Sequence, residues 1–549
     1  MENKNTLIAL ILILAIWFGY TTFFPPGPPV ENGSGVAEQK SDFEKKKDKS
    51  SLRSERPTQD EKPLDIAPSG LEADGNNVDV VVDTDIYRAV LTSNGARIKE
   101  FTLKKYKETA SKDSPLVQLT QGGRSHLYTL KSFGTEGLSL PENASFSYQG
   151  DEENIHLGHG ESQDLHFAVT LDSGAVVHKI FTFTADKYFF DVELRYANRG
   201  NKTLKGAVGF SLVNRWDESR DKGGFSLGAQ DFIGPTTFDG EDIHTDDIEA
   251  LVDEGPKEYS SAQWTGFGTK YFVSIVEPKQ ESYDYFRIQK DADYVENRIV
   301  SPYTTIEPGT SASMSYLVYM GPKEIDLLKS AGHDFERIID FGFFSVLSKP
   351  LLHFLKFIYS YIHNYGFAII LLTVIIKAIF WPLTQKSYTS MKAMQKLQPE
   401  MQKVREKYKN DKERLNKELM SLYKEKRVNP LGGCLPMLVQ IPVFIALYKV
   451  LLFSIELRHA PFIFWLTDLS AKDPYFITPV LMGASMFLQQ KMTPTTMDPT
   501  QAKIFMIMPV VFTFLFLNFP SGLVIYWLVN NVLTIFQQLL INRKNPVEA

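Results

Sequence analysis

One lysine inside an apolar stretch is the residue whose chemistry stands out in this chain. Lys377 lies in the mainly apolar run Tyr365–Leu383, whose nineteen residues would extend about 28 Å as a helix, enough to cross a bilayer. A charged amine at that depth costs about 2.5–3.5 kcal/mol on insertion scales, so it normally faces a polar interior and marks a functional site. Such a cation would attract a carboxylate or polar group of a substrate. The alternative is that Lys377 extends to the lipid headgroups, since Leu383 is only six residues away.

Other polar and aromatic residues could share a site with this lysine. Thr373 precedes Lys377 by one helical turn and lies on the same face of the predicted helix. Further candidates lie in later apolar segments: Gln440, Ser485, Trp527, Asn530 and Thr534. Each of them alone is explained by hydrogen bonding between helices. Together with a lysine that has no Asp or Glu in any apolar segment to neutralise it, they favour a polar groove within the membrane.

The distribution of apolar segments predicts a polytopic α-helical membrane protein with six spans. Residues 1–24 are predicted to be a retained N-terminal membrane anchor, because the apolar run Thr6–Phe24 ends in bulky residues without a small-residue cleavage site. Residues 362–383 form the next span. Residues 430–541 contain four more, and residues 542–549 form a short tail.

Between the anchor and the later spans, the chain is acidic and largely β-patterned. Residues 25–77 are polar and rich in proline, so we predict a disordered linker. Residues 78–340 alternate apolar and polar residues between turn signals, which predicts a β-sandwich domain. No catalytic constellation is found there, and Trp216 and Trp264 could line a ligand cleft or pack in the core. Residues 5–341 carry a net charge of −18, whereas residues 342–549 carry +12.

Two polar patterns flank the span at 362–383. Residues 341–361 repeat a polar residue every three or four positions, which predicts an amphipathic helix lying along the membrane surface. Residues 384–429 hold thirteen Lys or Arg against six acids and two amphipathic stripes, which predicts a cytoplasmic helical hairpin. Its candidate cations for capturing a substrate or ribosome are Lys392, Lys396, Lys403, Arg405, Lys407 and Arg414. A solvated charged surface is the alternative. Both termini would be cytoplasmic, with the large domain outside.

Three motifs carry a resemblance to a known family. They are NPLGGCLPMLVQIPVFIALYKVL (Asn429–Leu451), the preceding TSMKAMQKLQPEMQKVREKY, and FPSGLVIYWLVNNVLTIFQQ (Phe519–Gln538). With the anchor, linker and large domain, they resemble the YidC membrane insertase family of Gram-negative bacteria, related to mitochondrial and chloroplast insertases. The resemblance implies a five-helix core whose hydrophilic groove opens to cytosol and lipid but is closed externally. It also implies a β-supersandwich for the periplasmic domain.

The resemblance also assigns roles to individual residues. It implies that Lys377 occupies the position of the groove's single basic residue, which is usually arginine, and that Thr373 and Gln440 match groove residues. Trp527, beside Tyr526, would match an aromatic position that is tyrosine in close relatives. Lysine keeps the positive charge but lacks the forked geometry with which arginine pairs carboxylates.

The resulting expectation is an insertase of the cell inner membrane that needs no cofactor and is not an enzyme. The sequence carries no nucleotide-binding or metal motif. The resemblance implies nascent membrane proteins as substrates, and the Sec translocon with its accessory subunits, the ribosome and membrane lipids as partners. A secondary transporter is the rival, although the internal repeats typical of that class are not found. A structural envelope protein is a third class, and it would tolerate loss of the polar residues.

Overall fold

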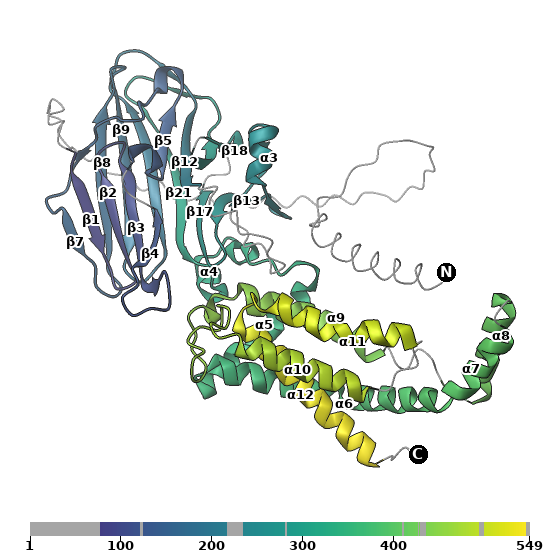
Figure 1. Ribbon diagram of the computed structural model, residues 1–549. Helices are drawn as coiled ribbons and strands as arrows, with labels where there is room; N and C mark the ends of the chain where they lie inside the picture. The colour runs from purple at the N-terminus through teal and green to yellow at the C-terminus, as the bar shows by residue number, and fades with distance from the viewer. Residues whose placement is uncertain are drawn as a thin grey trace, which may run out of the picture. The chain divides into compact units, whose positions relative to one another are not determined.

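A computed structural model describes residues 77–120, 124–216, 234–279, 283–291, 293–408, 411–426, 428, 435–493 and 499–544. The predicted anchor at 1–24, the linker up to residue 76 and the last five residues of the tail lie outside the described residues. Within the described part of the chain, a region of strands is followed by a region of helices (Figure 1).

The strand region is a β-sandwich, as the alternating sequence predicts. Along β10 every second residue is buried, so one face of the strand packs inward. Aromatic rings join different sheets: Phe101 of β3 lies 6.2 Å from Phe190 of β10, and Phe210 of β12 stacks on Tyr316 of β21 at 4.3 Å. The strands are β1 Asp79–Asp83, β2 Tyr87–Thr92, β3 Arg97–Lys107, β4 Leu116–Thr120, β5 Lys131–Gly134, β6 Ser147–Tyr148, β7 Asn154–His156, β8 Ser162–Thr170, β9 Ala175–Thr184, β10 Phe189–Asn198, β11 Leu204–Gly206, β12 Val208–Arg215, β13 Gly234–Phe238, β14 Ile243–Thr245, β15 Lys257–Tyr259, β16 Trp264–Gly268, β17 Phe272–Pro278, β18 Tyr285–Lys290, β19 Tyr294–Val300, β20 Thr304–Ile306 and β21 Ser311–Pro322.

The described strands form three large sheets and one small pair. The first has the order β4-β3-β2-β1-β7, in which only β1 and β7 run parallel. The second has nine strands in the order β14-β13-β16-β17-β21-β10-β9-β8-β6, and the third has the order β15-β18-β19-β12-β5. The pair is β11-β20. Trp216 and Trp264 both lie buried in the shared core, so packing is the correct alternative for these two residues.

The helical region begins with short helices that link it to the sandwich. The helices are α3 Ile248–Asp253, which lies within the sandwich, α4 Ile325–Ala331, α5 Ser345–Ile362, α6 Tyr365–Lys396, α7 Gln398–Lys407, α8 Lys412–Glu425, α9 Leu435–Phe453, α10 Ile477–Met492, α11 Pro499–Phe516 and α12 Ser521–Lys544. On α5, Leu352 and Leu355 pack into the helical core while Phe343, just before it, and Val346 are exposed. One face of α5 therefore packs on the helical core and the other is exposed, and its position along the membrane surface stays a prediction.

Helix α6 continues well beyond the predicted end of its span at Leu383. The Thr384 hydroxyl donates to the carbonyl of Phe380, and the helix passes Pro382 to end at Lys396. The next helix, α7, starts with Pro399 in its first turn, where a missing backbone N–H is tolerated. The two arms of the basic hairpin meet where Tyr423 of α8 donates to the sulfur of Met401 at 3.8 Å. The predicted hairpin region thus begins within α6, and its paired arms are α7 and α8.

Two described helices are long and apolar enough to cross a membrane. They are Tyr365–Lys396 and Ser521–Arg543, and the shorter apolar helices are Gln440–Phe453 and Met506–Phe516. Helices α6, α9, α10, α11 and α12 pack around one apolar cluster. A topology of six spans stays a prediction, because its first span lies outside the described residues.

Candidate functional site

Lys377 lies inside the helical region and contacts a hydroxyl group instead of a carboxylate. Its half-buried side chain leaves α6, and the amine donates a hydrogen bond of 2.9 Å to the hydroxyl of Thr534 on α12. The Thr534 hydroxyl in turn donates to the carbonyl of Asn530, one turn earlier, at 2.6 Å. Within the described ranges, no Asp or Glu forms an ion pair with this lysine. The charge is held by neutral groups of one neighbouring helix.

Thr373 is close to Lys377 in sequence but does not hold it. Its side chain is 2% exposed, and its hydroxyl donates to the carbonyl of Ile369 at 2.7 Å. This bond satisfies the hydroxyl within its own helix, as is common for threonine at such a position. Lys377 instead contacts α12, and a groove role for Thr373 stays a prediction.

Gln440 of α9 reaches α12 through a tyrosine. The Gln440 side-chain amide donates to the hydroxyl of Tyr526 at 3.0 Å, and Tyr526 is buried. Trp527, the predicted aromatic groove residue, instead packs among rings, with Phe444 at 4.6 Å and Phe516 at 5.2 Å between centroids. The sequence named Trp527 as the aromatic groove residue and Tyr526 only as its neighbour, but Tyr526 makes the polar contact.

The polar contacts extend along α12 in steps of about one helical turn. Asn531 donates to the hydroxyl of Ser485 on α10 at 3.0 Å. Further along α12, the Gln538 amide donates to the hydroxyls of Tyr388 and Thr493. The polar side chains of α12 therefore contact α6, α9 and α10 in turn. Tyr388 and Thr493 were missed because neither lies in a predicted span, and Tyr388 is reached only because α6 continues beyond Leu383.

The cations of the basic hairpin lie apart from this cluster. Lys392 and Lys396 are on the last turns of α6, three more are on α7, and Arg414 is on α8. Five of the six predicted capture residues are exposed: Lys396, Lys403, Arg405, Lys407 and Arg414. Lys392 is half-buried and has an interaction of its own. The hairpin therefore presents a cationic surface distinct from Lys377.

At the opposite end of the helices, the loop between α9 and α10 is fixed by a buried carboxylate. Asp473 is fully buried and accepts hydrogen bonds from the Thr478 hydroxyl, from the Trp465 indole and from the backbone N–H groups of Thr478 and Tyr475, at 2.7–3.0 Å. Burial acts to raise the pKa of Asp473, but these hydrogen bonds outweigh it and hold the pKa below its usual value. The carboxylate is therefore ionised and organises the loop.

The same loop is joined to the start of α12. The backbone N–H of Ser521 donates to the carbonyl of Ala471 at 2.7 Å, and that of Gly522 donates to the carbonyl of Leu469 at 2.9 Å. The Ser521 hydroxyl also donates to the carbonyl of Asp468 at 3.0 Å. These bonds hold the loop against the end of α12 that lies away from the basic hairpin.

Comparisons with known proteins match both parts of the chain. A family described as "60Kd inner membrane protein" matches residues 357–548, and one described as "YidC periplasmic domain" matches residues 79–354. "Membrane protein insertase YidC" of Geotalea daltonii is 43% identical over 99% of this chain and 100% of its own length. The protein of that name from Geobacter metallireducens is 44% identical over 98% of both chains.

A solved structure is also similar over most of its length. It is described as "Active YidC insertase crystal structure with the first transmembrane domain resolved", and it matches 85% of this chain and 92% of its own with 19% identity. Its TM-score is 0.35, so it adds no argument beyond the sequence matches. Both halves of the chain match one family over nearly full length. The chain therefore belongs to the YidC family of membrane protein insertases, with the β-sandwich as its periplasmic domain.

Proposed function

We propose that this protein inserts nascent hydrophobic segments into the inner membrane through a positively charged groove centred on Lys377. The observation that carries the proposal is the environment of this lysine: its amine is held by the Thr534 hydroxyl and pairs with no carboxylate among the described residues. A cation in a low-dielectric region that has no fixed counter-charge attracts an acidic or polar group strongly. The incoming chain supplies that group.

The polar flank of a substrate enters first and the apolar segment follows. The groove is lined by Thr373, Lys377, Gln440, Ser485, Asn530 and Thr534, with Trp527 packed beside them. The hydroxyl and amide groups of these residues replace part of the water that the flank loses. The hydrophobic segment then leaves sideways between α6 and α9 into lipid. Burial of about twenty apolar residues drives this step, so the cycle uses no nucleotide.

The cytoplasmic hairpin makes the first contact with substrate or ribosome. Its exposed cations on α7 and α8 suit the phosphates of ribosomal RNA or an acidic nascent chain. Because α6 continues from Lys377 into the hairpin, one helix links the capture surface to the groove. The Sec translocon, its accessory subunits and membrane lipids are the further partners of this proposal. Both termini are cytoplasmic in it.

Closure on the periplasmic side keeps the groove open only to cytosol and lipid. The loop ordered by Asp473 and bonded to the start of α12 supports this part of the proposal. A one-sided groove admits the polar flank without opening a water path across the membrane. Insertion then proceeds without leakage of small ions.

Substitutions of the central lysine test the proposal in a strain depleted of its own insertase. Lys377→Ala is expected to slow insertion of substrates with acidic or polar flanks by about tenfold or more, because one charge-assisted contact is worth about 1.5–3 kcal/mol. Lys377→Arg keeps the charge and is expected to retain function. Substrates with uncharged flanks serve as the control. Equal insertion of charged substrates by all three proteins would overturn the electrostatic role.

A further inference from the structure

The periplasmic sandwich contacts the loop between α9 and α10 through one arginine of that loop. Arg458 is half-buried, and one of its terminal nitrogens donates to the backbone carbonyls of Lys107 and Glu108 at 2.6 and 3.1 Å. Its guanidinium also lies over the rings of Phe272 and Tyr271, at 5.2 and 5.7 Å from their centroids. Arg458 therefore contacts both the turn between β3 and β4 and the start of β17.

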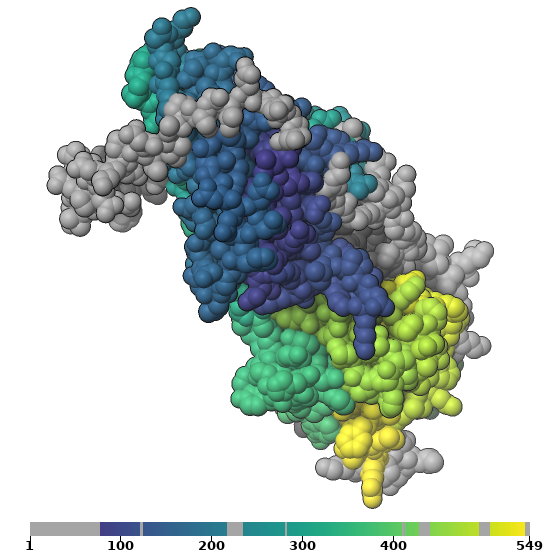
Figure 2. All heavy atoms as spheres, turned by 90° about the vertical axis from the view of Figure 1, so that its left-hand side faces the viewer, coloured from purple at the N-terminus to yellow at the C-terminus, as the bar shows by residue number. Residues whose placement is uncertain are grey.

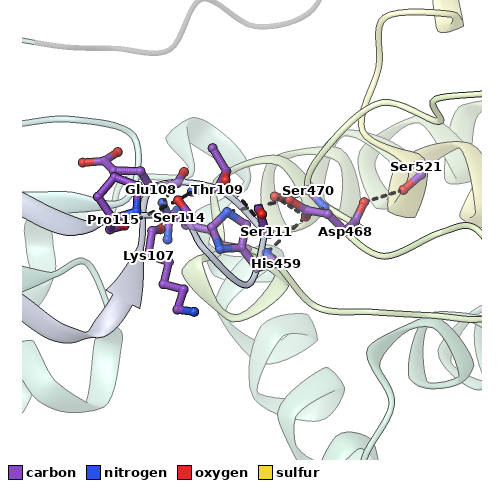
Figure 3. Close-up of polar contacts among 11 residues, drawn as sticks. Lys107, Glu108, Thr109, Ser111, Ser114, Pro115, His459, Asp468, Ser470 and Ser521 are labelled. Carbon is purple, nitrogen blue, oxygen red and sulfur yellow. Dashed lines mark hydrogen bonds and ion pairs between the residues drawn. The ribbon is translucent and has the colours of Figure 1, made fainter.

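The turn that receives Arg458 is held in shape by its own hydrogen bonds. The backbone N–H of Glu108 donates to the carbonyl of Pro115 at 2.9 Å, and that of Thr109 donates to the Ser114 hydroxyl at 2.8 Å. Figure 3 shows this turn on one side and the residues of the α9–α10 loop on the other. The two carbonyls that accept from arginine are thus presented by a fixed turn.

The same loop is also bonded by charge to α5 and packs against the sandwich. The amine of Lys356 on α5 lies 2.5 Å from Asp326 of α4 and 3.5 Å from Glu456, which precedes Arg458 in the loop. Ile455 of the loop is buried in the hydrophobic core of the sandwich, while Ile325 of α4 is buried in the helical core. Each region therefore buries a side chain from a segment next to the other region, and their surfaces are in contact in Figure 2.

From Arg458 the contacts lead to the start of α12. The backbone N–H of His459 donates to the carboxylate of Asp468 at 3.1 Å, and the same oxygen accepts from the backbone and hydroxyl of Ser470 at 2.8 and 2.7 Å. The carbonyl of Asp468 accepts from Ser521, the first residue of α12 (Figure 3). Helix α12 also carries Thr534, which holds the amine of Lys377.

We propose that Arg458 is a positioning residue through which the periplasmic sandwich holds the α9–α10 loop closed over the outer ends of the core helices. The sandwich is then part of the closure and not only a tethered domain. Its consequence for insertion rests on the proposed function, because a closed loop matters to insertion only if the groove opens to the opposite side. The closure itself is a property of the loop and is measurable without any substrate.

Hydrogen exchange of the full-length protein in lipid nanodiscs tests this closure. Arg458→Ala is expected to raise the exchange rate of amides in residues 459–474 by about tenfold, since hydrogen bonds to a charged donor are worth at least that factor. Arg458→Lys is expected to restore part of the protection, because an amine can still donate to the two carbonyls but lacks the planar stacking of guanidinium. Strands β9 and β10 should exchange as in the parent protein.

Lys472→Ala is the matched control, since Lys472 is a basic residue of the same loop with an exposed side chain and no ion pair among the described residues. It should leave exchange unchanged. Tyr271→Leu removes one ring below the guanidinium and should give a smaller increase than Arg458→Ala, so the proposal does not depend on one variant folding well. An effect of Arg458→Ala no larger than that of Lys472→Ala would overturn it. Because no substrate is present, that result would leave the insertion proposal standing.

Discussion

At the scale of residues, the site is a set of cross-helix hydrogen bonds that converge on α12. Lys377, Gln440 and Ser485 come from three different helices, and each is bonded to a side chain of α12. Sequence reasoning named all three, because a polar group in an apolar helix stands out by composition. It could not pair them, since pairing depends on how the helices rotate about their axes. Trp527 and Tyr526 are neighbours in sequence, and only the rotation of α12 decides which one faces Gln440.

The bond between Gln440 and Tyr526 predicts a non-additive effect on stability. Tyr526→Phe leaves the Gln440 amide without its partner, which costs about 1–3 kcal/mol of folding free energy for a buried polar group. Gln440→Leu combined with Tyr526→Phe removes both polar groups and should recover part of that loss. The midpoint of thermal unfolding in detergent measures this. If the double variant is destabilised by the sum of the single variants, the two side chains do not interact as described.

A titrating histidine in the sandwich predicts a dependence of stability on pH. Burial, aided by the nearby charges of His166 and Arg195, lowers the pKa of His178 to about 4 from 6.5. Between those two pH values the unfolded chain binds a proton that the folded sandwich does not, so stability falls as the pH drops from about 6.5 to about 4.

Pulse proteolysis in urea measures this change on the full-length protein. The urea concentration at which half of the sandwich is unfolded should decrease as the pH is lowered from 7 to 5. His178→Gln should make that decrease smaller. Replacement of the exposed, uncharged Val252 by alanine is the control, and it should leave the pH dependence as it is in the parent. The same pH dependence in His178→Gln as in the parent would show that His178 is not the group responsible.

At the scale of elements, the helices pack through close approaches that the sequence pattern does not reveal. A Cβ placed on Gly483 of α10 would lie 1.8 Å from the hydroxyl oxygen of Thr513 on α11. Thr513 is fixed there because its hydroxyl donates to the carbonyl of Pro509 at 2.7 Å. A glycine at this position therefore sets the distance between α10 and α11.

Substitution of this glycine predicts a clash that a second change relieves. Gly483→Ala should lower the thermal midpoint, because overpacking a helix contact costs about 1–3 kcal/mol. Thr513→Ala alone should have a small effect, and Gly483→Ala combined with Thr513→Ala should regain most of the stability. Light-scattering-detected unfolding in detergent gives the comparison. No rescue in the double variant would show that the loss arises elsewhere.

The β elements were easier to predict than the helix ends. Alternation along residues such as Phe189–Asn198 fixes both the strand and its buried face, because the period is two. The sequence marks an apolar span up to Leu383 and helical residues after it, but it does not show that α6 runs through both. The helix continues because Pro382 needs only local adjustment and the following residues favour helix. The length of an apolar run predicts a membrane span, but it does not predict the residue at which the helix ends.

At the scale of the whole molecule, the sandwich and the helices are coupled at the loop between α9 and α10. The sequence divided the chain correctly into a β region and a helical region by charge and pattern. It gave no sign that Ile455 completes the core of the sandwich or that Ile325 completes the core of the helices. Such contacts between distant segments have no local signature, so only the fold reveals them.

Removal of most of the sandwich tests how far the two regions depend on each other. Deletion of residues 78–322 keeps α4 and its buried Ile325, and all contacts of Lys377, Gln440 and Ser485 remain. We expect insertion to persist, whereas amides of residues 459–474 should exchange faster because the partners of Arg458 are gone. Complete loss of insertion with a folded helical region would contradict this expectation and show that insertion requires the sandwich.

The most direct test of the groove is site-specific photo-cross-linking to a stalled nascent membrane protein. A photoreactive residue at Gln440, at Asn530 or at the exposed position Ile379 reports which surface the arriving chain touches first. We predict early cross-links from 440 and 530 that weaken in Lys377→Ala, with those from 379 appearing only after release. Early cross-links from 379 alone, unaffected by the substitution at Lys377, would contradict the account.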